Sequence, residues 1–404
     1  NEKPTIPVQF SGGASDMELF ELEISGCGFA GIMAKTDPDG TNPWWWYGNF
    51  EQKNTCLHHL HVHDTDGEGC YLGYYTSGMS DAKYTGDTVT FENLNGEMVT
   101  YVKGNTYKKK AHYLTGLRFY RNLFEHTSYD GVQISDTIGE VCYNTLRECA
   151  VREEASQTSG LSIQSFSGKC YNNFLLDNHG PNLQVGPIGD IELFNNVVQS
   201  KHGVGVQFLF DYSSPEQNPS GAAEGSGVVN EKIQIVFHNN VLSTPGMTAN
   251  GRNTVQVRGV HMVDNLIAND GNLFANMTSG TIAAWTEQAV GNMIIPYSEL
   301  YSKSIEFKIA DYVGGDYRVS NDSPLVSAGL GNHFLFDYRG YYNWFKSIFP
   351  IGAFMGKYLD SSVIDSAIRL KAITAVLETS IPNTVSILFD YVGMPVQYRL
   401  GESE

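Results

Sequence analysis

Side chains that could transfer protons are concentrated in a few short segments of this sequence. One segment holds Asp64, Asp66 and Glu68, and another holds His126 and Asp130. Hydrolysis of a glycosidic bond needs two carboxyl groups on either side of the scissile bond. Asp66 or Glu68 could act with Asp130, provided that the fold places the two segments on neighbouring strands about 4.8 Å apart.

A β-elimination is the other chemistry that these residue types could support. It needs a base that removes the proton beside a carboxylate and a group that neutralises that carboxylate. His126, His202, Arg152 or Tyr71 could provide these functions, and Asp64, Asp66 and Glu68 are candidate ligands for calcium, which prefers oxygen donors. The alternative for each acidic residue is a solvated turn in which its side chain bonds to nearby backbone.

A histidine cluster offers a further possibility. His58, His59, His61 and His63 lie within six residues, and strand alternation predicts that the last three share one face. Such a cluster could bind a metal, although zinc requires a tight tetrahedral geometry. The alternative is a cluster of ordinary surface histidines.

The element that must position these side chains is an internal repeat. Six segments align, and they are Arg121-Asn122-Leu123-Phe124, Asn144-Thr145-Leu146-Arg147, Asn172-Asn173-Phe174-Leu175, Asn195-Asn196-Val197-Val198, Asn239-Asn240-Val241-Leu242 and Asp264-Asn265-Leu266-Ile267. Their second residues are separated by 23, 28, 23, 44 and 25 positions. A period near 23 fits a coil of three short strands and three turns, and the step of 44 fits one coil that carries a long loop.

Asparagine dominates this repeat, and five of the six second positions are Asn, with Thr145 the exception. Asparagine tolerates the left-handed conformation at a bend. Its amide can also bond to the same amide one coil above, which predicts a ladder of stacked side chains.

A second register lies about ten residues after each of these segments. Its strands are Gly131-Val132-Gln133-Ile134, Gly160-Leu161-Ser162-Ile163, Asn182-Leu183-Gln184-Val185, Gly205-Val206-Gln207-Phe208 and Thr254-Val255-Gln256-Val257. Apolar and polar residues alternate in each strand, so the apolar pair should face the interior and the polar residue should face outward. An outward row is therefore predicted, and it consists of Tyr71, Gln133, Ser162, Gln184, Gln207 and Gln256, with Gln164 and Arg258 two places further along their strands.

This pattern resembles the right-handed parallel β-helix repeat family, which includes many secreted bacterial polysaccharide lyases, glycosidases and epimerases. The resemblance covers roughly residues 17–275 and implies an all-β solenoid with long loop insertions, whose substrate lies along one parallel sheet. Asp316-Tyr317-Arg318-Val319 through Ser323-Pro324 to Ala328-Gly329 resembles the segment that closes such solenoids. We therefore expect a β-helix over 1–310, a closing segment over 311–358 and a β extension over 359–404.

The outward row and an aromatic loop are the candidate binding surfaces. Amides and hydroxyls suit sugar hydroxyls, which both donate and accept hydrogen bonds; the alternative is that the row only stabilises the sheet. Trp45 lies in a Gly/Pro-rich loop over 37–49 that could stack on a sugar ring, or could instead fold back and cap the solenoid.

Composition narrows the choice of partners. The net charge of −18 disfavours nucleic acid, because binding phosphates requires a basic face. No stretch approaches the roughly 20 apolar residues of a membrane span, and a secreted or cell-surface location is what the resemblance implies. Cys142 and Cys170 occupy similar tetrapeptides and are expected to be stacked interior thiols, with a disulfide as the alternative.

Two functions follow from these observations. The first is a carbohydrate-active enzyme that cleaves an extracellular polysaccharide, as a lyase or a glycosidase, which the long loops favour. The second is a non-catalytic β-helix that serves as an adhesin, a fibre component or a glycan-binding protein, which the absence of a recognised catalytic motif favours. In either case the expected partner is a polysaccharide or glycan, with calcium as a possible cofactor.

Overall fold

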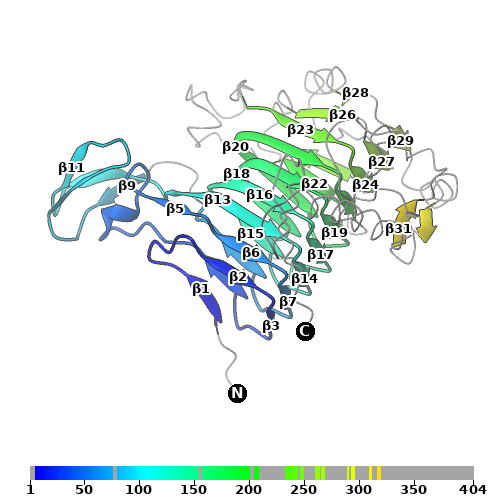
Figure 1. The fold of residues 1–404 in the computed structure, drawn as a ribbon, viewed down its shortest axis with the longest axis horizontal. Helices are drawn as coiled ribbons and strands as arrows, with labels where there is room; N and C mark the ends of the chain where they lie inside the picture. Colours follow the sequence, from blue (N-terminus) through cyan, green and yellow to red (C-terminus); the bar gives the residue numbers. More distant parts are fainter. Residues whose placement is uncertain are drawn as a thin grey trace, which may run out of the picture.

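The structure is a computed structural model. It describes residues 5–75, 80–153, 157–200, 204–208, 233–243, 246–249, 260–263, 265–268, 289–290, 293–295, 309–311 and 316–319. Successive coils stack from the N-terminal strands towards β28 (Ala289–Val290) and β29 (Met293–Ile295), and neighbouring coils pair in parallel (Figure 1). The chain is therefore a parallel β-helix, as the repeat predicts.

Each coil contributes a strand to three faces. The first face consists of β1 (Val8–Phe10), β4 (Ile32–Ala34), β8 (Cys70–Leu72), β15 (Val132–Ile134), the first part of β18 (Leu161–Tyr171), the first part of β20 (Leu183–Phe194), β22 (Val204–Phe208) and β25 (Gly246–Ala249). The second face consists of β2 (Glu18–Phe20), β6 (Cys56–His58), β13 (Tyr113–Tyr120), β16 (Thr137–Cys142), the second parts of β18 and β20, β23 (Ile235–His238), β26 (Val260–Val263) and β28. The third face consists of β3 (Glu23–Ser25), β7 (His61–His63), β14 (Leu123–Glu125), β17 (Thr145–Arg147), β19 (Phe174–Leu176), β21 (Val197–Gln199), β24 (Val241–Ser243), β27 (Leu266–Ala268) and β29.

The core is the space that the three faces enclose. Val132, Ile134, Leu161 and Ile163 are fully buried, and they belong to one cluster that runs through the coils from Ile24 to Leu242. Burying one such side chain stabilises a fold by roughly 1.5–3 kcal/mol. Stacking therefore stabilises each coil through its neighbours, because a coil cannot bury its apolar residues alone.

The predicted asparagine ladder is present, with one change of register. Side-chain amides donate from Asn122 to Asn144, from Asn144 to Asn173, from Asn173 to Asn196, from Asn196 to Asn240 and from Asn240 to Asn265, at 2.9–3.0 Å. The sequence alignment placed Thr145 in this row, which was wrong by one residue. The step of 44 residues from Asn196 to Asn240 spans a single coil, as predicted.

The left-handed residues at this corner are not the ladder asparagines. Positive φ values of 53–60° occur one position earlier, at Arg121, Tyr143, Asn172, Asn195 and Asn239. Asparagine is therefore required at the ladder position for its hydrogen bonds, while the bend itself accepts several residue types.

Cys142 and Cys170 do not stack on one another. Strand pairing places Cys142 beside Tyr171 and Cys170 beside Val141, so the two thiols are one residue out of register and face opposite sides of the sheet. Cys170 belongs to the interior core, whereas Cys142 packs outside it with Tyr171 and Phe194. All six cysteines are reduced and buried.

A small β unit interrupts the coil between β8 and β13. It contains β9 (Ser80–Lys83) paired with β12 (Thr106–Lys109), and β10 (Val89–Glu92) paired with β11 (Met98–Tyr101). Figure 1 shows these hairpins projecting from the stack beyond β5 (Glu51–Lys53). No helix in the described residues is long and apolar enough to span a membrane.

The predicted C-terminal divisions fall largely outside the described residues. An antiparallel pair of β30 (Ile309–Asp311) and β31 (Asp316–Val319) lies at the expected start of the closing segment.

Candidate active site

The outward row predicted on the first face is assembled by strand pairing. The predicted members Tyr71, Gln133, Ser162, Gln184 and Gln207 pair in this order, and strand pairing adds Gln9 and Met33 before Tyr71. The next coil places Thr248 beside Gln207, a position that the sequence alignment gave to Gln256. Gln256, Arg258 and His202 lie outside the described residues.

The polar side chains of this row bond chiefly to one another. Gln184 Oε1 accepts hydrogen bonds from Ser162 Oγ at 2.8 Å and from Gln164 Nε2 at 2.6 Å, and Gln184 Nε2 donates to Gln207 at 2.7 Å. Gln133 donates to Ser135. Gln133 and Ser162 are also buried, so much of the row's hydrogen-bonding capacity is used within the sheet.

Glu68 and Asp130 form a stacked acidic pair where β8 and β15 begin. The backbone N–H of Gly69 donates to the carbonyl of Asp130 at 3.0 Å, which fixes the two acids on adjacent coils. This is the neighbour relationship proposed from the sequence. Both residues are buried, with exposed fractions of 0% for Glu68 and 1% for Asp130.

In each carboxyl group of this acid pair, one oxygen accepts a hydrogen bond and the other has no hydrogen-bond partner among the described residues. Gln157 Nε2 donates to Glu68 Oε1 at 2.5 Å, and the backbone N–H of Ser159 donates to Asp130 Oδ1 at 2.6 Å. Within the described part of the chain, Glu68 Oε2, Asp130 Oδ2 and Ser159 Oγ are buried without a hydrogen-bond partner. Such orphaned groups are costly in a folded protein and are usually explained by function, water or an ion.

Burial controls the protonation of the acid pair. Burial is the main reason that the pKa of Asp130 is raised to about 8; the Ser159 N–H acts to lower it, and the neighbouring Glu68 charge makes a smaller contribution to the increase. Burial also raises the pKa of Glu68, and Lys35 opposes that shift. Asp130 is therefore mostly protonated at neutral pH and can donate a proton.

Lys35 and two tyrosines lie on the first face next to the acid pair. The Lys35 ammonium lies 4.6 Å from the ring centroid of Tyr71 and 4.9 Å from that of Tyr74, and it forms an ion pair with Asp37 at 3.0 Å. Burial raises the pKa of the Tyr71 hydroxyl, so this group remains protonated as a hydrogen-bond donor. The Glu68 charge also acts on Tyr71, so this predicted binding residue lies close to the acid pair.

The remaining predicted acid–base and metal residues occupy neighbouring turns. His126 is exposed, and its charge acts on Asp64. Arg152 donates a hydrogen bond to the backbone carbonyl of Asp66 at 3.3 Å and forms an ion pair with its carboxylate at 3.7 Å. Asp64 instead bonds to His63 Nδ1 at 2.7 Å. Among the described residues, no group of three ligand atoms includes Asp64 or Asp66, so the two aspartates predicted to bind calcium face different partners.

The aromatic loop packs on the projecting β unit. Trp46 is buried against Tyr84, Tyr101 and Tyr107, and Trp45 is half-buried. Trp44 is the exposed tryptophan of this loop, and its ring stacks on that of Phe91, with the two ring centroids 3.7 Å apart. The loop therefore anchors this β unit, and Trp44 rather than Trp45 offers the larger accessible surface.

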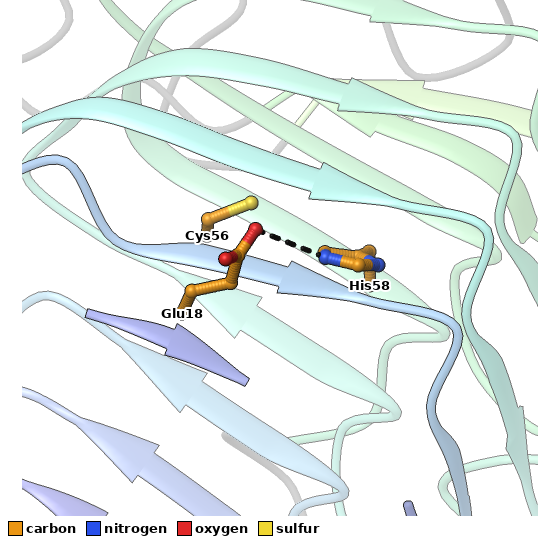
Figure 2. Close-up of side chains that lie close together, drawn as sticks. All are labelled: Glu18, Cys56 and His58. Carbon is orange, nitrogen blue, oxygen red and sulfur yellow. Dashed lines mark hydrogen bonds and ion pairs between the residues drawn. The ribbon is translucent and has the colours of Figure 1, made fainter. Parts of the chain in front are cut away.

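In the described part of the chain, two groups of metal-ligand type occur on the other faces. Glu18, Cys56 and His58 converge on β2 and β6, where Glu18 reaches His58 Nε2 at 3.2 Å (Figure 2). Glu23, His61 and His63 form the second group on β3 and β7. The predicted histidine cluster is therefore divided, because the turn at His59 sends His58 to the second face and His61 and His63 to the third.

Sequence reasoning did not identify Lys35, Gln157 or Ser159 as site residues. A signal for Ser159 was present, because Glu68, Asp130 and Ser159 each precede the glycine that opens a first-face strand. Lys35 and Gln157 lie outside that repeat position, and only the packing of the turns places them here.

Comparisons with known proteins find similarity to solved structures but not to any described family or curated sequence. No protein-family description matches the sequence, and no curated protein matches it. Among solved structures, the chain is similar to the pectate lyase Pel9A, with a TM-score of 0.40 and 12% identity over 88% of this chain and 87% of that one. It is also similar to XylC in complex with xylose, with a TM-score of 0.27 and 10% identity over 69% of this chain and 50% of that one.

Proposed function

We propose that the protein cleaves a polysaccharide, with Asp130 as general acid and Glu68 as its carboxylate partner. The observation that carries this proposal is the acid pair itself. Its two carboxyl groups occupy adjacent coils, each has one unpartnered oxygen, and the pKa of Asp130 is about 8. Glycoside hydrolysis requires one carboxyl group that can donate a proton beside a second carboxyl group, and Asp130 can act as that proton donor.

The spacing favours one hydrolytic route over the other. The backbones of adjacent parallel strands lie about 4.8 Å apart, and we take this spacing as the approximate separation of the two carboxyl groups. Retaining glycosidases hold their carboxyl groups about 5–5.5 Å apart, whereas inverting enzymes need roughly 6.5–9.5 Å to admit a water molecule. We therefore assign Glu68 the role of nucleophile in a retaining hydrolysis. A lyase reaction, with Tyr71 or Lys35 acting on a uronic acid, is the alternative within the same site.

Access to the acid pair requires a local opening. Glu68 and Asp130 are covered, and the contact that must open is the hydrogen bond from Gln157 to Glu68. The polymer would then lie along the first face, next to Tyr71 and the Lys35 ammonium. The repeat family leads us to expect an extracellular glycan as the substrate.

A non-catalytic role is the second candidate, and the outward row favours it. Ser162, Gln164 and Gln184 bond to each other, so they offer a ligand fewer donors and acceptors than their composition implies. In that case the protein would bind a glycan or serve as a structural solenoid, and the acid pair would have no catalytic part.

The test is a panel of uronic-acid and neutral polysaccharides, assayed both for new reducing ends and for the absorbance of unsaturated products, with calcium and with chelator. Reducing ends alone are expected, and both Asp130→Asn and Glu68→Gln should lower the rate by about 10²–10⁴-fold. Glu140→Gln, at an acid of the second face, is the matched control and should retain activity. Full activity in Asp130→Asn would refute the assignment, and unsaturated products would indicate a lyase. No cleavage of any polymer would favour the non-catalytic candidate.

A further inference from the structure

The outer side of the third face carries a histidine pair that the proposed cleavage does not use. His61 and His63 are two residues apart on β7, so their side chains share one face, while Val62 between them is buried in the core. Their rings lie 4.4 Å apart between centroids. Strand pairing sets Glu23 beside His61 and Glu125 beside His63.

Each flanking carboxylate bonds to the histidine next to the one that it pairs with in the sheet. Glu23 Oε1 lies 3.1 Å from His63 Nε2, and Glu125 Oε2 lies 2.8 Å from His61 Nε2. One ligand atom each from Glu23, His61 and His63 lie within 4.8 Å of one another. Ligands bound to zinc at about 2.0–2.2 Å lie roughly 3.3–3.5 Å apart, so small side-chain rotations would complete a three-ligand site.

A second observation fixes the orientation of one ligand. Asp64 accepts a hydrogen bond from His63 Nδ1 at 2.7 Å. In the neutral imidazole, a proton on Nδ1 leaves the lone pair on Nε2, the atom that faces Glu23, so a metal ion there would replace the Nε2 proton of the charged ring. Histidines that bind metals almost always donate their other ring N–H to a carboxylate or carbonyl in this way. Arg147, which bonds to Glu125, holds the flanking carboxylate in turn.

One side of this group is open to solvent at Glu23 and His61, while His63 is half-buried. A groove of about 580 Å³ crosses the corner between the second and third faces, and Glu23, His61, Arg121 and Tyr143 line it. Three protein ligands leave a fourth position of a tetrahedral site open towards solvent. Two imidazoles with one carboxylate suit zinc and its neighbours in the first transition series, whereas calcium prefers oxygen ligands alone.

We propose that Glu23, His61 and His63 bind one divalent transition-metal ion of the zinc class, with Asp64 orienting His63. The group in Figure 2 is the competing site, since it also offers three ligands. It is less suited, because Cys56 is 1% exposed and burial raises the pKa of its thiol. The His58 ring is also stacked between those of Phe20 and Tyr120.

The experiment titrates the metal-free full chain with Zn²⁺ by calorimetry and with Co²⁺ by visible absorption. One equivalent of tetrahedral Co²⁺ is expected, without the sulfur-to-cobalt charge-transfer band that a Cys56 ligand would produce. His61→Gln and His63→Gln should each weaken binding at least 100-fold, and Asp64→Asn should weaken it about 10–100-fold, as is usual for an outer-shell partner.

Matched controls come from the competing group. His58→Gln and Cys56→Ser should bind Co²⁺ as the wild type does. Unchanged affinity in His63→Gln, or loss of binding in Cys56→Ser together with a sulfur-to-cobalt band in the wild type, would overturn the proposal. Asp64→Asn alters an exposed side chain and should fold. If the histidine variants do not fold, the metal affinity of Asp64→Asn still tests the proposal.

Discussion

Asn144 donates its side-chain amide to Asn173 Oδ1 on the next coil at 3.0 Å, and its own oxygen accepts from Asn122. The same Asn144 amide bonds to the carbonyl of Phe119. One buried side chain therefore joins three coils, and its neighbour Thr145 takes no part in the ladder.

Replacing the ladder residue should cost more than replacing its neighbour. Asn144→Ala leaves the buried backbone N–H of Asn122 without its acceptor and removes one of the two acceptors of the Asn122 amide, so we expect a loss of about 2–3 kcal/mol in the free energy of unfolding. Thr145→Ala should cost about 1 kcal/mol or less. Urea denaturation of both variants measures the difference, and equal losses would contradict the register described above.

The protonation of Asp130 predicts how stability depends on pH. Its pKa is raised from 3.8 to about 8 in the folded state, so folding binds a proton between these values. Stability contributed by this group is full at low pH and falls as pH rises through that window, by at most about 6 kcal/mol.

Thermal unfolding between pH 4 and 9 measures this dependence. Asp130→Asn should flatten the curve, and Glu68→Gln should flatten it less, because the pKa of Glu68 is also raised. If the stability of the wild type changes with pH by the same slope as that of Asp130→Asn, then Asp130 is ionised in the folded protein over this pH range.

The backbone at Gly69, next to Glu68, is too closely packed to accept a side chain. A Cβ atom there would lie 2.4 Å from the carbonyl oxygen of Gly131 and 2.6 Å from Phe124 Cδ1. Because a backbone atom cannot give way cheaply, Gly69→Ala should destabilise the fold by about 3 kcal/mol or more. Gly40→Ala is the control, since its Cβ would meet only the Lys83 carbonyl at 3.4 Å. Similar midpoints of chemical denaturation for the two variants would be inconsistent with this packing.

The six thiols should be protected from modification. All are buried, and burial raises the pKa of Cys70, Cys142, Cys149 and Cys170, which disfavours the reactive thiolate. An aromatic disulfide reagent should titrate six thiols in denaturant and react with them only slowly in the native protein. Ser80→Cys, at an exposed position, should add one fast-reacting thiol, and a fast native reaction in the wild type would contradict the burial.

The sequence by itself determined the solenoid, because a coil of three short strands repeats its apolar positions at a period that can be counted. It also predicted that an asparagine row would stack and that Asp66 or Glu68 would lie near Asp130 on a neighbouring coil; the structure selects Glu68. These conclusions depend only on local periodicity and on the rule that equivalent positions of successive coils lie side by side.

Tertiary structure alone decided the register within single coils and the partners of the turns. Asn144 and Thr145 are adjacent, as are Asn172 and Asn173, so the alignment could shift by one residue without losing similarity; the same ambiguity misplaced Cys142 against Cys170. Asp64 and Asp66 both looked like calcium ligands, yet His63 and Arg152 are the groups that reach them. The side chains of turns contact residues from other coils, and the distances between these groups cannot be read from a pattern along the chain.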